Sequence, residues 1–303
     1  MTHYQLVEQN KQRSAIVVVG FMLFVVVATW LMTYTFGYDP GLVGVALLFS
    51  GVVSFGSYWF SDSVVLAVSK ARPVTREEFF DFYTVTENLC MSLQLPVPKL
   101  YVIDDTAMNA FSTGRDPKHA AVVATTGLLS RLNRAEIEGV VAHELSHVSN
   151  YDILLMSIVS ILVGFIALLA DWLMRISFVG GGKKSDSRDS GQLGMILGLV
   201  GFVLVLLSPL IANLIKLAIS RKREFLADAS GVAITKNPSG LISALSKISQ
   251  DQEPLEAANK ATAHLYISDP LKNQKGGVGW FAGLFNTHPP VEERIAALQS
   301  ILQ

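Results

Sequence analysis

The chain has 303 residues, of which 50% are hydrophobic and only 16% are charged. Soluble domains usually carry about 25% charged residues, so this composition indicates a membrane protein. The formal net charge of −1 gives no sign of nucleic-acid binding, and we expect no nucleic-acid partner. Cys90 is the only cysteine, which excludes an internal disulfide and a zinc site built from thiolates.

Two uncharged segments lie in the N-terminal part of the chain, after the charged residues Lys11 and Arg13. Residues 14–38 form an apolar run that is long enough to cross a hydrocarbon core of about 30 Å as a helix. A cleaved signal peptide is the alternative, but this run is too long and no small-residue cleavage site follows it. We therefore predict transmembrane helices at residues 14–36 and 41–61, joined by a turn at Asp39-Pro40.

The charges that flank this hairpin predict its orientation. The connector carries no Lys or Arg, whereas Lys11 and Arg13 precede the first span and Lys70 and Arg72 follow the second. Because basic residues favour the cytoplasmic side, we expect the N-terminus and the segment after residue 69 to lie in the cytoplasm.

Residues 69–150 have the pattern of a soluble α+β domain. A helix is predicted from Thr75 to about Ser92, and Pro96 and Pro98 end it. Strands rich in Val and Ala are predicted at residues 99–104, 110–113 and 120–125.

The next helix carries the sequence His143-Glu144-Leu145-Ser146-His147. Asn133 and Glu136 predict a capping box at its start. The two histidines lie one turn apart on one face, so their rings can bind one metal ion, usually zinc, and Glu144 can accept a proton from a water that the metal activates. The alternative is a chance match on an ordinary surface helix.

Two more apolar segments follow, and we predict transmembrane helices at residues 153–175 and 192–217. A buried hairpin in a large soluble core is the alternative. The connector between them is basic, although this topology places it outside the cell. The basic run 221–223 favours the inner side for residues 220–303, which we predict to be the second, mainly helical part of the cytoplasmic domain.

A catalytic zinc needs a third protein ligand and one open position. Metzincins place a third histidine six residues after the second, where this chain has Ile153. Glu224 and Asp228 are better candidates, because a spacing of four lets one carboxylate bind zinc and the other hold a ligand histidine. The alternative is an ordinary amphipathic helix end, with Arg221 paired to Glu224.

Four stretches in this order resemble the HtpX-type membrane-bound zinc metalloproteases, whose wider family includes the CAAX prenyl endopeptidases. They are Asn109-Ala110-Phe111-Ser112-Thr113-Gly114, His143-Glu144-Leu145-Ser146-His147, residues 220–228 and Thr287-His288-Pro289-Pro290. The resemblance implies a zincin-like fold of the gluzincin type and one Zn²⁺ per subunit. It implies His143, His147 and Glu224 as the zinc ligands and Glu144 as the general base.

The resemblance also suggests roles for other residues. Asn109, Ala110 and Phe111 resemble an edge strand that pairs with an extended peptide substrate; a turn followed by a core phenylalanine is the alternative. His288 either stabilises an oxyanion near the metal or occupies a helix start. The remaining histidines, His3, His119 and His264, have no partner motif and are expected on the surface.

Taken together, the sequence predicts a mainly α-helical integral membrane protein with four transmembrane helices and a zincin-like α+β cytoplasmic protease domain. We expect a multi-pass protein of the cell membrane, in contact with the lipid bilayer, with its active site facing the cytoplasm. The resemblance implies that it cleaves damaged or misfolded membrane proteins, or unfolded polypeptides, in protein quality control and the stress response. The alternatives are a site-specific peptidase of the prenyl-endopeptidase type and a non-enzymatic membrane scaffold with a structural zinc.

Overall fold

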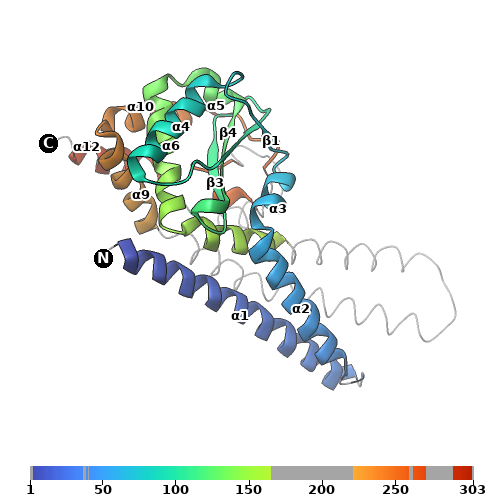
Figure 1. The fold of residues 1–303 in the computed structure, drawn as a ribbon. Coiled ribbons are helices and arrows are strands. Elements are labelled where there is room, and N and C mark those ends of the chain that lie inside the picture. Colours follow the sequence, from blue (N-terminus) through green and yellow to red (C-terminus); the bar gives the residue numbers. More distant parts are fainter. Residues whose placement is uncertain are drawn as a thin grey trace.

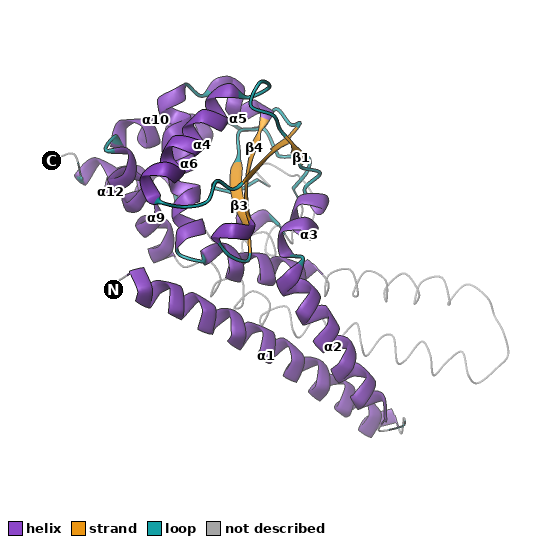
Figure 2. Ribbon diagram, viewed as in Figure 1, coloured by secondary structure: helices purple, strands orange, loops and turns teal. Residues whose placement is uncertain are grey.

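The computed structural model describes residues 3–36, 39, 41–164, 221–258, 262–270 and 289–301. This part of the chain is mainly helical and forms a globular part with one small sheet, from which a pair of long helices projects (Figure 1, Figure 2).

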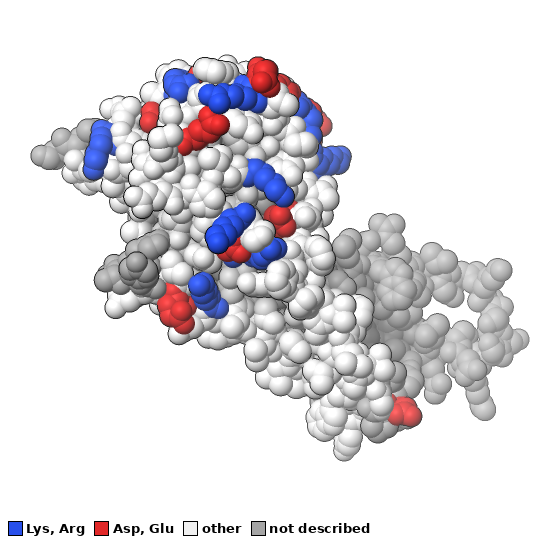
Figure 3. All heavy atoms as spheres, viewed as in Figure 1, with Lys and Arg blue, Asp and Glu red and all other residues white. Residues whose placement is uncertain are grey.

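The projecting pair consists of α1 (His3–Phe36) and α2 (Gly41–Trp59), which pack side by side. Large apolar side chains are exposed along both helices, for example Val19 at 63% and Leu48 at 74%. Figure 3 shows charged side chains scattered over the visible face of the globular part and almost none along the outer part of this pair. A contiguous apolar surface along two helices is unfavourable in water, and the lipid bilayer would bury it.

The described residues contain one to three candidate membrane spans. Within the described residues, the segment Gln5–Val27 of α1 is by itself long and apolar enough to cross a membrane. Two bent helix pairs would raise the number to three: α2 with α3 (Ser61–Val68), bent by 82°, and α6 with the helical segment Asp152–Gly164, bent by 83°. The predicted span at 192–217 and residues 165–175 of that at 153–175 lie outside the described residues, so four spans remain a prediction.

The sheet has the strand order β1-β2-β4-β3. Its strands are β1 (Arg72–Pro73), β2 (Lys99–Ile103), β3 (Ala110–Gly114) and β4 (Ala120–Thr125). The pair β2 and β4 is parallel, and β3 runs antiparallel to β4 with Phe111 opposite Val123. The three predicted strands are therefore confirmed, and β3 lies at an edge of the sheet.

One face of the sheet packs against α4 (Phe80–Leu93) and α6 (Arg134–Ser149) over a core that includes Val122, Val140 and Leu145. The predicted first helix begins at Phe80 rather than at Thr75. The turn before it is held to β1 by the ion pair between Glu78 and Arg72, at 2.6 Å. The short helix α5 (Thr126–Arg131) joins β4 to the loop before α6.

Helix α6 is the centre of the globular part. Helices α9 (Arg221–Thr235) and α10 (Pro238–Gln250) lie beside it, and α12 (Val291–Ser300) packs against α9 and α10. Gly139 allows a close approach, because a Cβ there would lie 2.8 Å from the Leu241 Cα of α10. Gly231 of α9 lies almost as near, since its Cβ would be 3.2 Å from the His143 nitrogen.

The opposite face of the sheet is covered by α3 and by residues 255–258 and 262–267, and the latter include the 3₁₀ turn η2 (Ala263–Leu265). Tyr266 packs edge-on against Phe111 with the ring centroids 4.9 Å apart. His264 was predicted to be a surface residue, and this is wrong. Its side chain is fully buried and lies 3.0 Å from the Ser160 hydroxyl, because η2 turns it inward.

Candidate metal centre

The helix α6 begins with the predicted capping box. The Asn133 side chain accepts the Glu136 N–H at 3.0 Å, and Glu136 Oε2 accepts the Asn133 N–H at 2.8 Å. These reciprocal bonds satisfy two N–H groups that a helix start otherwise leaves unpaired. These bonds fix the residue at which the helix starts. They thereby also fix the direction in which His143 and His147, one turn apart on the same helix, point.

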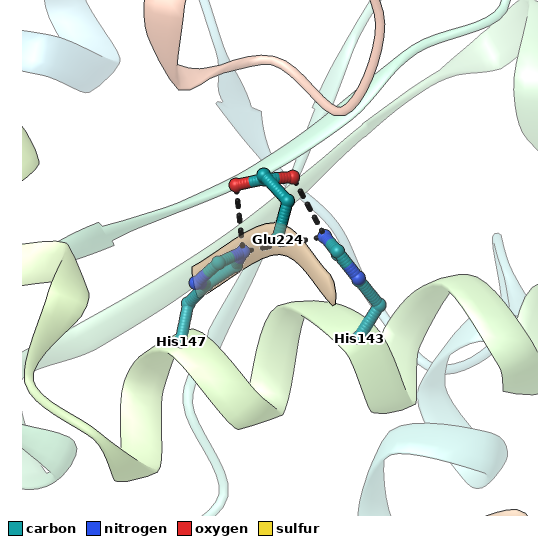
Figure 4. Close-up of side chains that lie close together, drawn as sticks. All are labelled: His143, His147 and Glu224. Carbon is teal, nitrogen blue, oxygen red and sulfur yellow. Dashed lines mark hydrogen bonds and ion pairs between the residues drawn. The ribbon is translucent and has the colours of Figure 1, made fainter. Parts of the chain in front are cut away.

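The structure brings His143, His147 and Glu224 together in one buried cluster (Figure 4). The two Nε2 atoms lie 3.2 Å apart. Glu224 extends over them from α9, with one carboxylate oxygen 3.7 Å from His143 Nε2 and the other 3.6 Å from His147 Nε2. The alternative in which Glu224 pairs with Arg221 at a surface helix end is wrong, since Glu224 is only 2% exposed.

The geometry of these three residues fits a zinc ion. Ligand bonds of about 2.0 Å in a tetrahedral site place two donor atoms about 3.3 Å apart. The observed separations of 3.2 to 3.7 Å are close to this value.

The buried charges around the cluster fit a divalent cation as well. Among the described residues the centre has four buried carboxylates, of Glu144, Asp152, Glu224 and Asp228. Two buried guanidiniums, of Arg223 and Arg294, face them. When both histidines are neutral, as metal binding requires, two excess negative charges are buried, which is costly, and a bound Zn²⁺ would neutralise them.

Asp228 holds His143 from behind. Its Oδ1 lies 2.9 Å from His143 Nδ1, so we assign the ring proton to Nδ1, which leaves Nε2 free to bind metal. The fully buried Arg294 of α12 donates to both Asp228 oxygens, at 2.6 and 2.8 Å. Burial raises the pKa of Asp228, but the charge of Arg294 outweighs it and holds the pKa at about 2.

Asp152 holds His147 in the same way, with its Oδ2 3.1 Å from His147 Nδ1. Its other oxygen accepts from the Asn10 amide of α1 at 2.8 Å and lies 3.4 Å from an Arg223 nitrogen. The Asn10 side-chain oxygen accepts from the same Arg223 nitrogen at 3.1 Å. The first membrane helix therefore takes part in the support of a metal ligand.

The carboxylates around His147 also affect its charge. Burial lowers the pKa of His147, but the hydrogen bond to Asp152 and the charge of Glu224 outweigh it and raise the pKa to about 9. The metal-free site therefore keeps a proton on His147 at neutral pH, and a metal ion has to displace it.

Glu144 lies between the metal ligands and the edge strand. Its side chain is 2% exposed, and its Oε2 accepts a hydrogen bond of 2.7 Å from the Ser112 hydroxyl of β3. The hydroxyl also lies 3.3 Å from the Glu144 carbonyl oxygen. Ser112 thus fixes the carboxylate at one oxygen and leaves the other for a reacting group.

Comparisons with known proteins agree with this site. The model of peptidase family M48 matches residues 78–302. A protease HtpX homolog of Streptococcus uberis is 39% identical over 299 residues, which cover 98% of this chain and 99% of that protein. A second, from Dictyoglomus thermophilum, is 41% identical and the match covers 98% of this chain and 94% of that protein.

The chain belongs to peptidase family M48. It is a membrane metallopeptidase of the HtpX type, with His143, His147 and Glu224 as its zinc-ligand triad. It also aligns with the crystal structure of S. mikatae Ste24p, at a TM-score of 0.47 and 20% identity, over 97% of this chain and 67% of that one. At this TM-score the likeness supports no conclusion about function.

The edge strand of this M48 chain is not fully open. The Ala110 carbonyl accepts the Ile267 N–H at 2.9 Å, and the Asn109 amide donates to the Ser268 carbonyl at 3.0 Å. Phe111 is a buried core residue, as the alternative interpretation of this stretch predicted. The backbone of the chain's own residues 267–268 thus occupies the part of the edge where a substrate contact was expected.

Three supporting residues of the M48 site were not identified from the sequence: Asn10, Asp152 and Arg294. Asp152 lies five residues after His147, which is not a helical spacing, and reaches it only because the chain bends by 83° at Tyr151. His288 lies outside the described residues, so its role remains a prediction.

Proposed function

We propose that this M48 metallopeptidase is a membrane-anchored endopeptidase with its active site facing the cytoplasm, and that it cleaves damaged or misassembled membrane proteins. The observation that carries the reaction is the position of Glu144, beside the ligand triad and fixed by Ser112. A zinc ion that only stabilises the fold needs no such carboxylate.

Glu144 acts as the general base and then as the general acid. His143, His147 and Glu224 would hold a zinc ion, which would supply polarisation of the scissile carbonyl and a lower pKa, toward about 7, for a water molecule. The Glu144 oxygen that Ser112 does not engage removes a proton from the attacking water. The same carboxyl group then delivers that proton to the leaving amine, which completes hydrolysis.

The backbone of β3 provides a place for an extended substrate. The Ala110 carbonyl points away from β4, because it accepts the Ile267 N–H on the opposite side of β3. Backbone groups alternate between the two sides of a strand, so the N–H and C=O of Ser112 also face the free edge. Pairing at Ser112 would bring a peptide next to Glu144 and would require little side-chain selectivity.

The contacts of α1 support the proposed location. Asn10 bonds to Asp152, which in turn holds His147, so the metal centre lies next to the membrane helix. Substrates in or near the bilayer are therefore within reach. The charge asymmetry of the first hairpin supports the cytoplasmic orientation, and reporter fusions at Lys99 and Gln252 are both expected to give a cytoplasmic signal.

The test of the reaction is Glu144→Gln in purified, detergent-solubilised protein. We expect one zinc per chain to be kept and cleavage of an unfolded protein such as casein to fall by about 10²–10⁴-fold, the usual contribution of a general base. A chelator should abolish cleavage by the wild type. Normal cleavage by the zinc-loaded variant would refute the assignment. Cleavage restricted to prenylated peptides would favour the prenyl-endopeptidase alternative.

A further inference from the structure

A cavity of about 950 Å³ lies where the membrane hairpin meets the globular part, and none of the three zinc ligands lines it. Its walls come from α1, α2, the helical segment Asp152–Gly164 and the loop after β3. None of its lining residues belongs to the metal centre, so peptide hydrolysis does not explain it.

The long walls of this groove are apolar. On α1 they follow one helical stripe through Ala15, Val18 and Met22, and Leu154 and Ile158 close the floor. From Lys11 to Met22 the helix rises by about 16 Å, which is about half of the 30 Å thickness of a hydrocarbon core. The groove therefore has the length of one lipid leaflet.

The end of the groove near the globular part is basic. Lys11 lies with its ammonium 4.6 Å from the centre of the Tyr151 ring, and the Arg115 guanidinium lies 4.8 Å from that of Trp59. Arg115 also donates to the Trp59 carbonyl at 2.9 Å, which fixes its position. These aromatic contacts hold two cations at the rim of a membrane helix pair, where lipid headgroups lie.

Lys118 adds a third basic residue to the lining, and Asp116 is its one carboxylate. That carboxylate accepts from His119 Nδ1 at 2.9 Å and from the Lys118 N–H at 2.8 Å, and lies 3.6 Å from Arg115 Nε.

We propose that this groove binds one anionic phospholipid, with its phosphate between Lys11, Arg115 and Lys118 and an acyl chain along α1. The excess of positive charge selects an anion, whereas an apolar peptide segment would need no basic end. The bound lipid would fill the space between the hairpin and the globular part and so fix their relative position.

Native mass spectrometry in mild detergent tests this proposal, with phosphatidylglycerol and phosphatidylcholine as the two probes. We expect one phosphatidylglycerol to stay bound per chain and phosphatidylcholine to be lost. Each basic residue near an anionic headgroup contributes about a fivefold gain in binding, so K11Q/K118Q should weaken phosphatidylglycerol binding by about 30-fold. Both lysines are exposed, so the variant should fold.

The matched control is R76Q/K99Q, which removes two exposed charges outside the groove and should leave lipid binding unchanged. V18F, which fills the apolar wall, should weaken binding without a change of charge. Equal retention of both lipids, or an equal loss in the control, would overturn the proposal. Displacement of the lipid by inorganic phosphate alone, or retention of an apolar peptide in its place, would also overturn it.

Discussion

The two zinc histidines are supported by different parts of the molecule. His143 is held by Asp228 and Arg294, which both lie in the globular part. His147 is held by Asp152, which shares its other oxygen with Asn10 of the first membrane helix and with Arg223. The comparison shows that one half of the metal centre is independent of the hairpin, whereas the other half depends on it.

The largest effect in this comparison is expected on the His143 side. Arg294→Met leaves Asp228 as an uncompensated buried charge, which should lower the free energy of unfolding by about 3–5 kcal/mol. Asp228→Ala should weaken zinc binding by about 10–100-fold. Chemical denaturation and zinc competition with a chelator measure the two effects.

The control for Arg294 is Arg76→Met, since Arg76 is exposed and pairs with Glu87 on the surface. It should change the free energy of unfolding by about 1 kcal/mol or less. If Arg294→Met proved as stable as this control, the buried ion pair would not be a main support of the site.

A smaller effect is expected on the His147 side. The contact between Asp152 and His147, at 3.1 Å, is longer than that between Asp228 and His143, at 2.9 Å. Asp152→Ala should therefore weaken zinc binding near the lower end of the same range, by about 10-fold. Asp81→Ala, which removes an exposed carboxylate, is the control. Unchanged zinc affinity in Asp152→Ala would remove this residue from the centre.

The smallest effect is expected for Asn10→Ala, which supports His147 through Asp152 and also bonds to Arg223. Loss of one hydrogen bond is worth about 1 kcal/mol, or about fivefold in zinc affinity. Gln12→Ala on the same helix should have no effect, since among the described residues its side chain bonds only to Glu8. A double-mutant cycle sharpens the test, because Asn10→Ala should add nothing once Asp152 is alanine. Additive losses would show that Asn10 acts by another route.

What the sequence could predict depended on local patterns. The capping box of α6, the strand at 120–125 and the two histidines follow from short-range spacing and from residue preferences. The pair Glu224 and Asp228 could be chosen because four residues span one helical turn and cysteine ligands were excluded.

The rest depended on tertiary structure. Asp152 reaches His147 through a bend at Tyr151, whose φ of 60° no sequence pattern indicated. Asn10 lies in a polar segment that was interpreted as a flank of the first span, yet α1 begins at His3 and packs this segment on the metal centre. Arg294 belongs to the last helix, and the packing of α12 beside α9 brings it to Asp228.

Zinc analysis of Glu224→Ala after dialysis tests the central claim most directly. Two histidines alone are too few to retain a catalytic zinc, so this variant should contain none and should not cleave protein. Glu138→Ala, which removes a partly exposed carboxylate from α6, should keep one zinc per chain, as should the wild type. A folded Glu224→Ala protein that retains one tightly bound zinc would contradict the account and show that the third ligand is another residue.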